Sequence, residues 1–443
     1  MEHTYEPNES ISKRSIKKIR RRKHYADTDD EEDHIIIGTR VAEGHRNYQL
    51  MYDMLTGIRI AVGRVSAKMR RDPNNDDFTA AHKLVFDITG NELTPGVKYD
   101  FKFKDYAPWV FRNLREIFHI DAADYLMSLT HKYILSELGS PGKSGSFFYY
   151  SRDYRFIIKT IHHSEHSFMR KILSQYYDHC KQNPNTLLSR IYGLHRIKLP
   201  HGKKIHFVVM GNVFPPNKNV HETYDLKGST FGRITTDEEI DRNAHAVMKD
   251  LNWMNQGKKL ELGPIKKQLL LSQLEKDVLL LIKLNIMDYS LLVGIHELDR
   301  GNDETYYDHR LHLVEVNIYI YIYIYNRPST KQTKADKRKT VKYTTSPVPL
   351  GSNSQISNST SEERRHCIFY ADNGGYQSSG QHDRNTNILY FIGIIDILTP
   401  YNFVKRTEHI WKSITQDKNT ISSVPPKLYG ERFLEFMRNA VRS

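Results

Sequence analysis

Apolar and polar positions alternate with two different periods along the first half of the chain, which predicts helices and strands together. Helical spacing appears around residues 48–55 and across 101–138, and a β-branched run directly after 55 predicts a strand. Helical spacing returns over 165–177, and further strands are predicted over 187–195 and 205–210. Ordered structure is expected from about residue 35. The mixture predicts an α+β protein.

Two further segments carry especially clear patterns. Residues 139–161 read as a glycine-containing turn, an aromatic strand, a tight Ser-Arg-Asp turn and an apolar strand that ends in Lys159. This order predicts a β-hairpin. Residues 390–396 read as a buried strand that ends in Asp396.

The organisation of the chain follows shifts in composition. Opposed blocks of cations and acids predict a disordered tail over 1–34. Ordered segments are predicted at 35–210, 211–301 and 388–443. Residues 302–387 are predicted to form a low-complexity insert. Inside it, residues 318–325 alternate Ile and Tyr. Two interpretations stay open: an edge strand, or retained intron sequence, since a repeated TAT ATA codon pair encodes Tyr-Ile. In the second case part of the insert would not belong to the mature protein.

Composition then narrows the function. The 443 residues include 65 Lys+Arg against 52 Asp+Glu, a net charge of +13, which indicates an anionic partner such as phosphate, nucleic acid or an acidic membrane. Cys180 and Cys367 stand far apart, which argues against a disulfide framework and a zinc cluster and favours a reducing compartment. No signal peptide or membrane span is visible, so any lipid would be reached from the water side.

A nucleotide kinase needs backbone N–H groups around the phosphates, a nearby lysine, a carboxylate at the acceptor hydroxyl and another for magnesium. Gly142, Gly145 and Ser146 offer such a phosphate-binding turn, and Lys159 follows from the next strand. An ordinary glycine turn is the competing interpretation of the loop.

The two carboxylates are found further along the chain. Asp288 stands between two apolar runs, where it could orient an acceptor hydroxyl or serve only as a turn or cap residue. Asp396 could hold magnesium or simply cap its strand. In residues 224–229 a turn combines Lys227 with a glycine and a serine, which suits a phosphate-facing loop.

A cationic segment follows Asp396. It contains Lys405, Arg406, His409 and Lys412 around Trp411, a mixture that suits the boundary between water and lipid, although a solvated charge run would look the same.

In this order, the motifs IGTRVAEGH, SGSFFYYSRDYRFIIK, YDLKGSTFGR, IMDYSLLVGIH and YFIGIIDIL resemble the phosphatidylinositol phosphate kinase family, most of all fungal type I enzymes. The resemblance covers residues 35–436 outside the insert. It implies a two-lobed fold distantly related to protein kinases, with an antiparallel-sheet N-lobe over 35–210, which contains the ATP-phosphate hairpin, and a mixed C-lobe over 211–301 and 388–443.

The resemblance also implies roles for single residues. Lys159 would hold the ATP phosphates, Asp288 would be the catalytic-loop carboxylate, Asp396 would bind Mg²⁺, and Lys227 would assist phosphate transfer. Glu165 is a weaker candidate for an ion pair that orients Lys159.

The activation loop is matched by residues 399–423. There Glu408 matches the glutamate that marks phosphorylation of phosphatidylinositol 4-phosphate at the 5-hydroxyl, and Lys405 and Arg406 match a basic pair expected to bind anionic lipid. Lys412 is grouped with them. The alternatives are a 4-kinase of phosphatidylinositol 5-phosphate and an inactive phosphoinositide-binding scaffold.

The implied partners are the phosphoinositide substrate, an anionic membrane surface and, by analogy, a second copy of the chain in a homodimer. A nucleic-acid partner is not expected, because aromatic residues do not interleave with the cations in a recognisable module. The expected location is cytoplasmic, at the inner face of the plasma membrane, with the nucleus as a second address.

Overall fold

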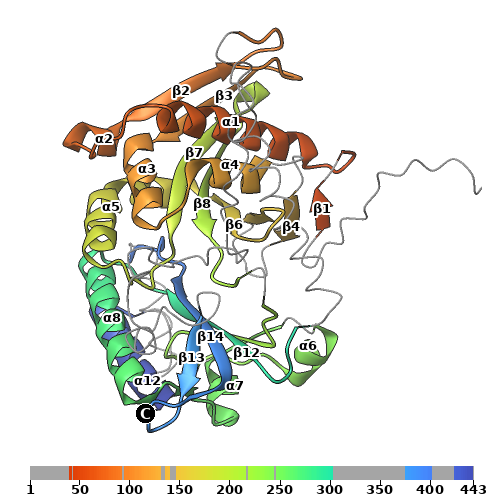
Figure 1. Ribbon diagram of the computed structural model, residues 1–443. Coiled ribbons are helices and arrows are strands. Elements are labelled where there is room, and N and C mark those ends of the chain that lie inside the picture. Colours follow the sequence, from red (N-terminus) through yellow and green to blue (C-terminus); the bar gives the residue numbers. More distant parts are fainter. Residues whose placement is uncertain are drawn as a thin grey trace, which may run out of the picture. The chain divides into compact units, whose positions relative to one another are not determined.

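The computed structural model describes residues 39–41, 43–91, 94–130, 135–139, 146–215, 218–243, 246–302, 375–401 and 424–442. These residues form two principal sheets with helices packed on them (Figure 1). The predicted α+β class is therefore confirmed. Among the described helices, none is both long and apolar enough to span a bilayer.

The first sheet has eight antiparallel strands in the order β1-β4-β5-β6-β8-β7-β3-β2. Their bounds are β1 Thr39–Val41, β2 Ala81–Phe86, β3 Phe101–Tyr106, β4 Leu135–Gly139, β5 Phe147–Tyr150, β6 Phe156–Ile161, β7 Ile191–Lys198 and β8 Lys204–Gly211. The predicted hairpin is β5–β6, and a short 3-10 turn, η2 (Pro200–Gly202), joins β7 to β8. This sheet is the antiparallel N-lobe that the resemblance implied.

Within the described residues, five helices accompany this sheet. They are α1 Tyr48–Ser66, α2 Asn75–Thr79, α3 Pro108–Ile117, α4 Ala122–Thr130 and α5 His163–Gln182. The strand predicted after residue 55 is wrong, because Ile58, Val62 and Val65 are buried at helical spacing and extend α1 to Ser66. Residues 101–106 are a strand rather than a helix, since buried and solvent-facing side chains alternate there. Residues 135–138, also predicted as helical, belong to β4 and pair with β5.

The second sheet is mixed, in the order β10-β9-β12-β14-β13, with only β10 and β9 parallel within the described residues. The strand bounds are β9 Glu222–Leu226, β10 Val247–Met248, β12 Ser290–Glu297, β13 Tyr376–Ser379 and β14 Asn385–Ile395, and a separate small sheet pairs β11 Leu260–Glu261 with β15 Val441–Arg442. The helices are α6 Asp237–Arg242, α7 Asp250–Asn255, α8 Gly263–Lys283 and α12 Pro426–Ala440. Figure 1 shows α8 and α12 packed together, and a side-chain carbon built on Gly430 of α12 would meet Ile282 of α8 at 2.7 Å.

The end of the predicted insert needs correction. Strand β13 and the start of β14 lie inside the range 302–387, so that range includes part of the second sheet. The polar composition misled the prediction, because Ser378 and Ser379 are buried through hydrogen bonds rather than through apolar side chains. Residues 303–374, with the Tyr-Ile alternation, lie outside the described residues.

Backbone hydrogen bonds join the two sheets directly. The segment that enters β7 pairs with β14: the Ser189 N–H donates to the Ile394 carbonyl at 2.8 Å, and the Ile394 N–H donates to Leu187 at 2.7 Å. Beneath this crossing, the fully buried carboxylate of Asp277 accepts hydrogen bonds from the Leu187 N–H and the Thr186 hydroxyl, both at 2.8 Å. The crossing therefore fixes the first sheet against the strand that carries Asp396.

Candidate active site

Strand register brings three of the predicted residues to one edge of the second sheet. Leu226 is opposite Leu291, and Ser290 is opposite Ile395. Lys227 follows the end of β9, Asp288 comes two residues before β12, and Asp396 follows the end of β14. Because β12 lies between β9 and β14 and is antiparallel to both, these three positions share an edge.

Both carboxylates at this edge have a left-handed backbone. Asp288 has a φ of +66° and Asp396 a φ of +61°. Aspartate tolerates this region better than most side chains, at a cost of about 1 kcal/mol. Such conformations concentrate at functional sites, and here they end two regular strands at the same edge.

Lys159 reaches this edge from the first sheet. In β6 it lies opposite Phe148 of β5 and Val208 of β8, and its side chain is 18% exposed. Its Nζ lies 3.0 Å from Oδ1 of Asp396. Lys159 and Asp396 therefore form a direct ion pair between the two sheets, which brings together two residues that the sequence analysis assigned to one site.

Lys227 makes a second pair at the same edge. Its Nζ donates to the backbone carbonyl of Asp288 at 2.6 Å and lies 3.0 Å from Oδ1 of the same residue. Both side chains are largely buried, at 15% and 25% exposed. Lys227 therefore positions both the backbone and the carboxylate of Asp288.

The interpretation of residues 224–229 as a phosphate-facing turn is wrong in one respect. The N–H groups of Lys227 and Gly228 donate to Oδ1 of Asp250, at 2.9 and 2.7 Å, so the turn uses them internally. The side chain of Ser229 is 2% exposed and does not face solvent. Within this turn, the Lys227 side chain is the group that remains directed at the proposed site.

Gly228 is required by the geometry of the same turn. Its φ is +69°, and a Cβ there would lie 3.2 Å from the Arg432 carbonyl oxygen and from the Cα of Phe433. The turn must therefore approach α12 with neither a side chain nor a right-handed backbone.

A network of ion pairs that the sequence analysis did not predict supports this edge. Arg233 pairs with both Asp225 and Asp250, and Asp225 also accepts a hydrogen bond from Ser290 at 2.9 Å. Burial lowers the pKa of Arg233, but the two carboxylates outweigh it and raise the pKa overall. One signal was available: Asp225, Lys227 and Arg233 all stand within one motif, and charged residues so close to a buried strand need partners.

Glu165 does not orient Lys159. Its carboxylate accepts a hydrogen bond from the His162 N–H at 2.7 Å and so caps the start of α5. In the described part of the chain, the carboxylate that pairs with Lys159 belongs to Asp396.

Several predicted residues lie outside the described residues: Gly142, Gly145, Lys405, Arg406, Glu408, His409, Trp411 and Lys412. Ser146 is described and is buried. It directly precedes β5, where the Phe147 N–H donates to the hydroxyl of Thr160 at 2.8 Å.

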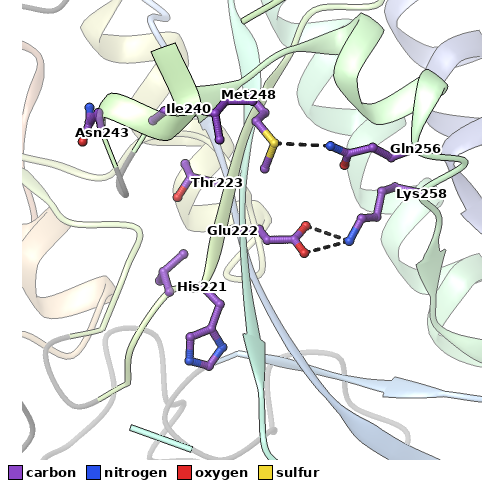
Figure 2. A pocket seen from close by; sticks show the side chains of 10 residues that line it. His221, Glu222, Thr223, Ile240, Asn243, Met248, Gln256 and Lys258 are labelled. Carbon is purple, nitrogen blue, oxygen red and sulfur yellow. Dashed lines mark hydrogen bonds and ion pairs between the residues drawn. The ribbon is translucent and has the colours of Figure 1, made fainter. Parts of the chain in front are cut away.

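A cavity of about 330 Å³ lies beside the start of β9, away from the two lysine–carboxylate pairs. Figure 2 shows Glu222 paired with Lys258 across it and Gln256 directed at the sulfur of Met248. None of Lys159, Lys227, Asp288 and Asp396 lines it. It is therefore separate from the candidate active site.

Comparison with known proteins agrees with this architecture. Residues 129–440 match the family model described as Phosphatidylinositol-4-phosphate 5-Kinase. The chain is 52% identical over 427 residues to phosphatidylinositol 4-phosphate 5-kinase its3 of Schizosaccharomyces pombe, covering 96% of this chain and 57% of that protein. It is 39% identical to phosphatidylinositol 4-phosphate 5-kinase 9 of Arabidopsis thaliana, covering 90% and 52%, and 38% identical to a probable phosphatidylinositol phosphate kinase of Dictyostelium discoideum, covering 92% and 59%.

The family match, together with an antiparallel first sheet and a mixed second sheet, identifies a lipid kinase fold. With more than half of its length matched by the family model, the chain belongs to the phosphatidylinositol-4-phosphate 5-kinase family. It spans a little over half the length of these curated relatives.

Proposed function

We propose that this chain phosphorylates phosphatidylinositol 4-phosphate at the 5-hydroxyl with ATP, which gives phosphatidylinositol 4,5-bisphosphate. Membership of the family supports this assignment, as do the names of the relatives from Schizosaccharomyces pombe and Arabidopsis thaliana. The proposal includes a peripheral position on the cytoplasmic face of the plasma membrane, a nuclear pool and a homodimer, as expected from the resemblance.

The single observation that carries the proposal is the 3.0 Å pair between Lys159 and Asp396. It joins residues that are 237 positions apart and come from different sheets. Phosphoryl transfer depends on positioning and on neutralising charge, so a lysine and a carboxylate held together where two sheets meet suit a triphosphate site.

Asp288 and Lys227 would act at the acceptor. The bond between the γ-phosphorus and the bridging oxygen of ADP breaks, and a bond to the 5-oxygen forms. The hydroxyl proton passes to the carboxylate of Asp288, which Lys227 positions through two contacts. Lys159 would neutralise charge on the phosphates.

The residues at this edge also fit Mg²⁺. The side chain of Asp396 is 44% exposed, and that of Asp288 is 25% exposed at the same sheet edge. Magnesium prefers oxygen ligands of this kind and supplies charge neutralisation between phosphate oxygens when bound. Asp396 would hold it, and Lys159 would keep that carboxylate in position.

A face of the first sheet supports the proposed membrane contact. Six cations project from it in two cross-strand rows, which are Lys83–Lys104–Arg196 and Lys102–Lys198–Lys204. The described carboxylates form no ion pair with them. Each cation near an anionic leaflet adds about 1 kcal/mol of attraction, so these rows, with Lys405, Arg406 and Lys412, would suffice for docking.

The test is a transfer assay on the purified chain. It is incubated with ATP, Mg²⁺ and vesicles that contain one monophosphorylated phosphoinositide at a time, and the phosphorylated ring position is identified. We expect 5-phosphorylation of phosphatidylinositol 4-phosphate. Asp288→Asn, Asp396→Asn and Lys159→Met should each lower kcat by about 1000-fold or more.

Lys171→Met is the matched control, because Lys171 is exposed on α5 and should leave kcat unchanged. Product at the 4-position of phosphatidylinositol 5-phosphate would favour the 4-kinase alternative, and Glu408→Ala should move preference in that direction if Glu408 selects the 5-kinase reaction. Vesicle binding without transfer to any lipid would instead indicate an inactive scaffold.

A further inference from the structure

Three histidines gather at the junction of β6, α5 and β8. His163 and His166 stand three positions apart in the first turns of α5, and His206 lies in β8 opposite Ile161, near the end of β6. One ligand nitrogen from each ring can be chosen so that all three lie within 4.8 Å of one another. Helix α5 and strand β8 therefore bring three imidazole rings close together.

The burial of these rings is unusual for histidine. His166 is 3% exposed and His206 is 6% exposed, while His163 opens to solvent. Neither ring nitrogen of His166 has a hydrogen-bond partner within the described part of the chain. A buried polar group without a partner is unfavourable, so a metal that accepts the lone pair of one ring nitrogen would satisfy that atom.

Cations lie near the two buried rings. Burial, with the nearby charges of Arg170 and Arg196, lowers the pKa of His166 to about 3. Burial, with Arg196 and Lys204, lowers that of His206 to about 4. The same cations oppose a bare dication, which favours a metal whose remaining ligand is an anion.

We propose that His163, His166 and His206 form a binding site for a divalent transition metal of the Zn²⁺ class, with a fourth position open to solvent beside His163. Three nitrogen ligands suit zinc, cobalt or copper and do not suit calcium or magnesium, which require oxygen. The three proposed ligands are different residues from Lys159, Lys227, Asp288 and Asp396, so we assign the metal no direct part in phosphoryl transfer.

Because of its location, a bound metal would affect the turn that follows the strand of Lys159. It would connect the first turn of α5 to β8, and His163 follows Lys159 by four residues along the chain. Occupancy would therefore restrain the turn between β6 and α5, immediately after the strand that presents Lys159. We expect metal to raise stability and to leave the ion pair between Lys159 and Asp396 in place.

Cobalt provides the probe, since tetrahedral Co²⁺ with nitrogen ligands absorbs visible light strongly. The full chain is first treated with a chelator and then titrated with Co²⁺ and, in competition, with Zn²⁺. We expect one equivalent of Co²⁺ to give the absorption bands of a four-coordinate site and Zn²⁺ to abolish them. A spectrum with only the weak bands of hexaaquo Co²⁺ would overturn the proposal.

Variants identify the ligands. His166→Ala, His206→Ala and His163→Ala should each weaken Co²⁺ binding by more than about 10-fold, because even partners outside the first coordination shell cost about that much. His163 is exposed, so His163→Ala keeps the test valid if a buried variant fails to fold. His382→Ala, an exposed histidine between β13 and β14, is the matched control and should bind as the wild type.

A metal-free packing of the three rings is the competing explanation. The rings of His166 and His206 lie 4.4 Å apart between centroids, a distance that ring contacts alone can give. Wild-type binding that is unchanged in His163→Ala would place the metal elsewhere and overturn the assignment. Because the readout is a spectrum, it is independent of kinase activity and of the proposed function.

Discussion

The two principal sheets use charged residues in different ways. In the first sheet, six cations belong to the strands themselves and face one another across β2, β3, β7 and β8. In the second sheet, the central paired positions of β12 and β14 are apolar, as in Leu291 opposite Ile394 and Val293 opposite Ile392. Lys227, Asp288 and Asp396 stand just beyond the strands, at one edge.

The first sheet thus provides an extended cationic face, whereas the second sheet provides a local site at the ends of its strands. Like charges directly opposite each other destabilise a sheet, so rows of cations are tolerated where they face solvent and an anionic partner. A charge within the buried strands of the second sheet needs a partner, as Asp225 has in Arg233, and the candidate catalytic groups stand where the strands end. Lys159 is the exception: it belongs to the first sheet and completes the edge of the second.

The largest expected effect concerns the crossing that joins the two sheets. Asp277→Ala removes a buried acceptor that serves His179, Thr186, Leu187 and Gln273. Buried donors left without this carboxylate should lower the free energy of unfolding by about 3 kcal/mol, measured by urea denaturation.

Glu275→Ala, on the same helix, tests whether burial is the cause. Glu275 forms an exposed ion pair with Arg438, and its loss should cost less than about 1 kcal/mol. Equal costs for the two variants would mean that the crossing contributes little to holding the sheets together.

An intermediate effect is expected at the edge of the second sheet. Gly228→Ala introduces a Cβ that meets the backbone of α12 at 3.2 Å and forces an alanine to a φ of +69°. We expect a loss of about 1–2 kcal/mol in stability and a fall in kcat, because Lys227 is displaced from Asp288.

The control separates backbone strain from the close approach. Gly232 has a similar φ of +67°, but a Cβ there meets nothing within 4 Å. Gly232→Ala should therefore cost about 1 kcal/mol and leave kcat unchanged. If both variants lost activity equally, displacement of Lys227 would not be the reason.

The smallest effect is expected on the cationic face. Lys104 lies between Lys83 and Arg196, and burial together with these neighbours lowers its pKa. Lys104→Gln should raise stability by a few tenths of a kcal/mol by relieving repulsion. It should also weaken binding to anionic vesicles by about 1 kcal/mol, measured by cosedimentation at low salt.

Lys276→Gln makes the same change of charge at an exposed position on α8. Vesicle binding should stay at the wild-type level in this variant. A similar loss in both would indicate attraction by net charge rather than by the two rows of cations.

The sequence sufficed for charged residues beside apolar runs and failed for those that depend on register. The predicted strand end at Lys159 was wrong, because β6 continues to Ile161. Lys159, Asp288 and Asp396 were found because each stands beside a strongly apolar run, where an isolated charge is conspicuous. Asp250 and Arg233 were missed, since their importance comes from partners brought together by the turn after β9. The roles of Lys159, Asp288 and Asp396 in catalysis and binding stay predictions.

The cationic rows and the histidine cluster were missed for the same reason. The pairing of Lys104 with Arg196, or of Ile161 with His206, is a property of strand order, which the local pattern does not contain. The 22 histidines give no local spacing that singles out three of them. Residues 101–106 were read as helical for a related reason, because a short strand rich in Phe and Lys fits either period.

The backbone crossing between Leu187–Ser189 and Ile394 constrains how a nucleotide could enter. Sliding one sheet past the other would break main-chain hydrogen bonds at the point where they are most deeply buried. Rotation about that point would keep those bonds and still separate Lys159 from Asp396. The crossing is thus placed to act as the hinge if the two sheets open by rotation.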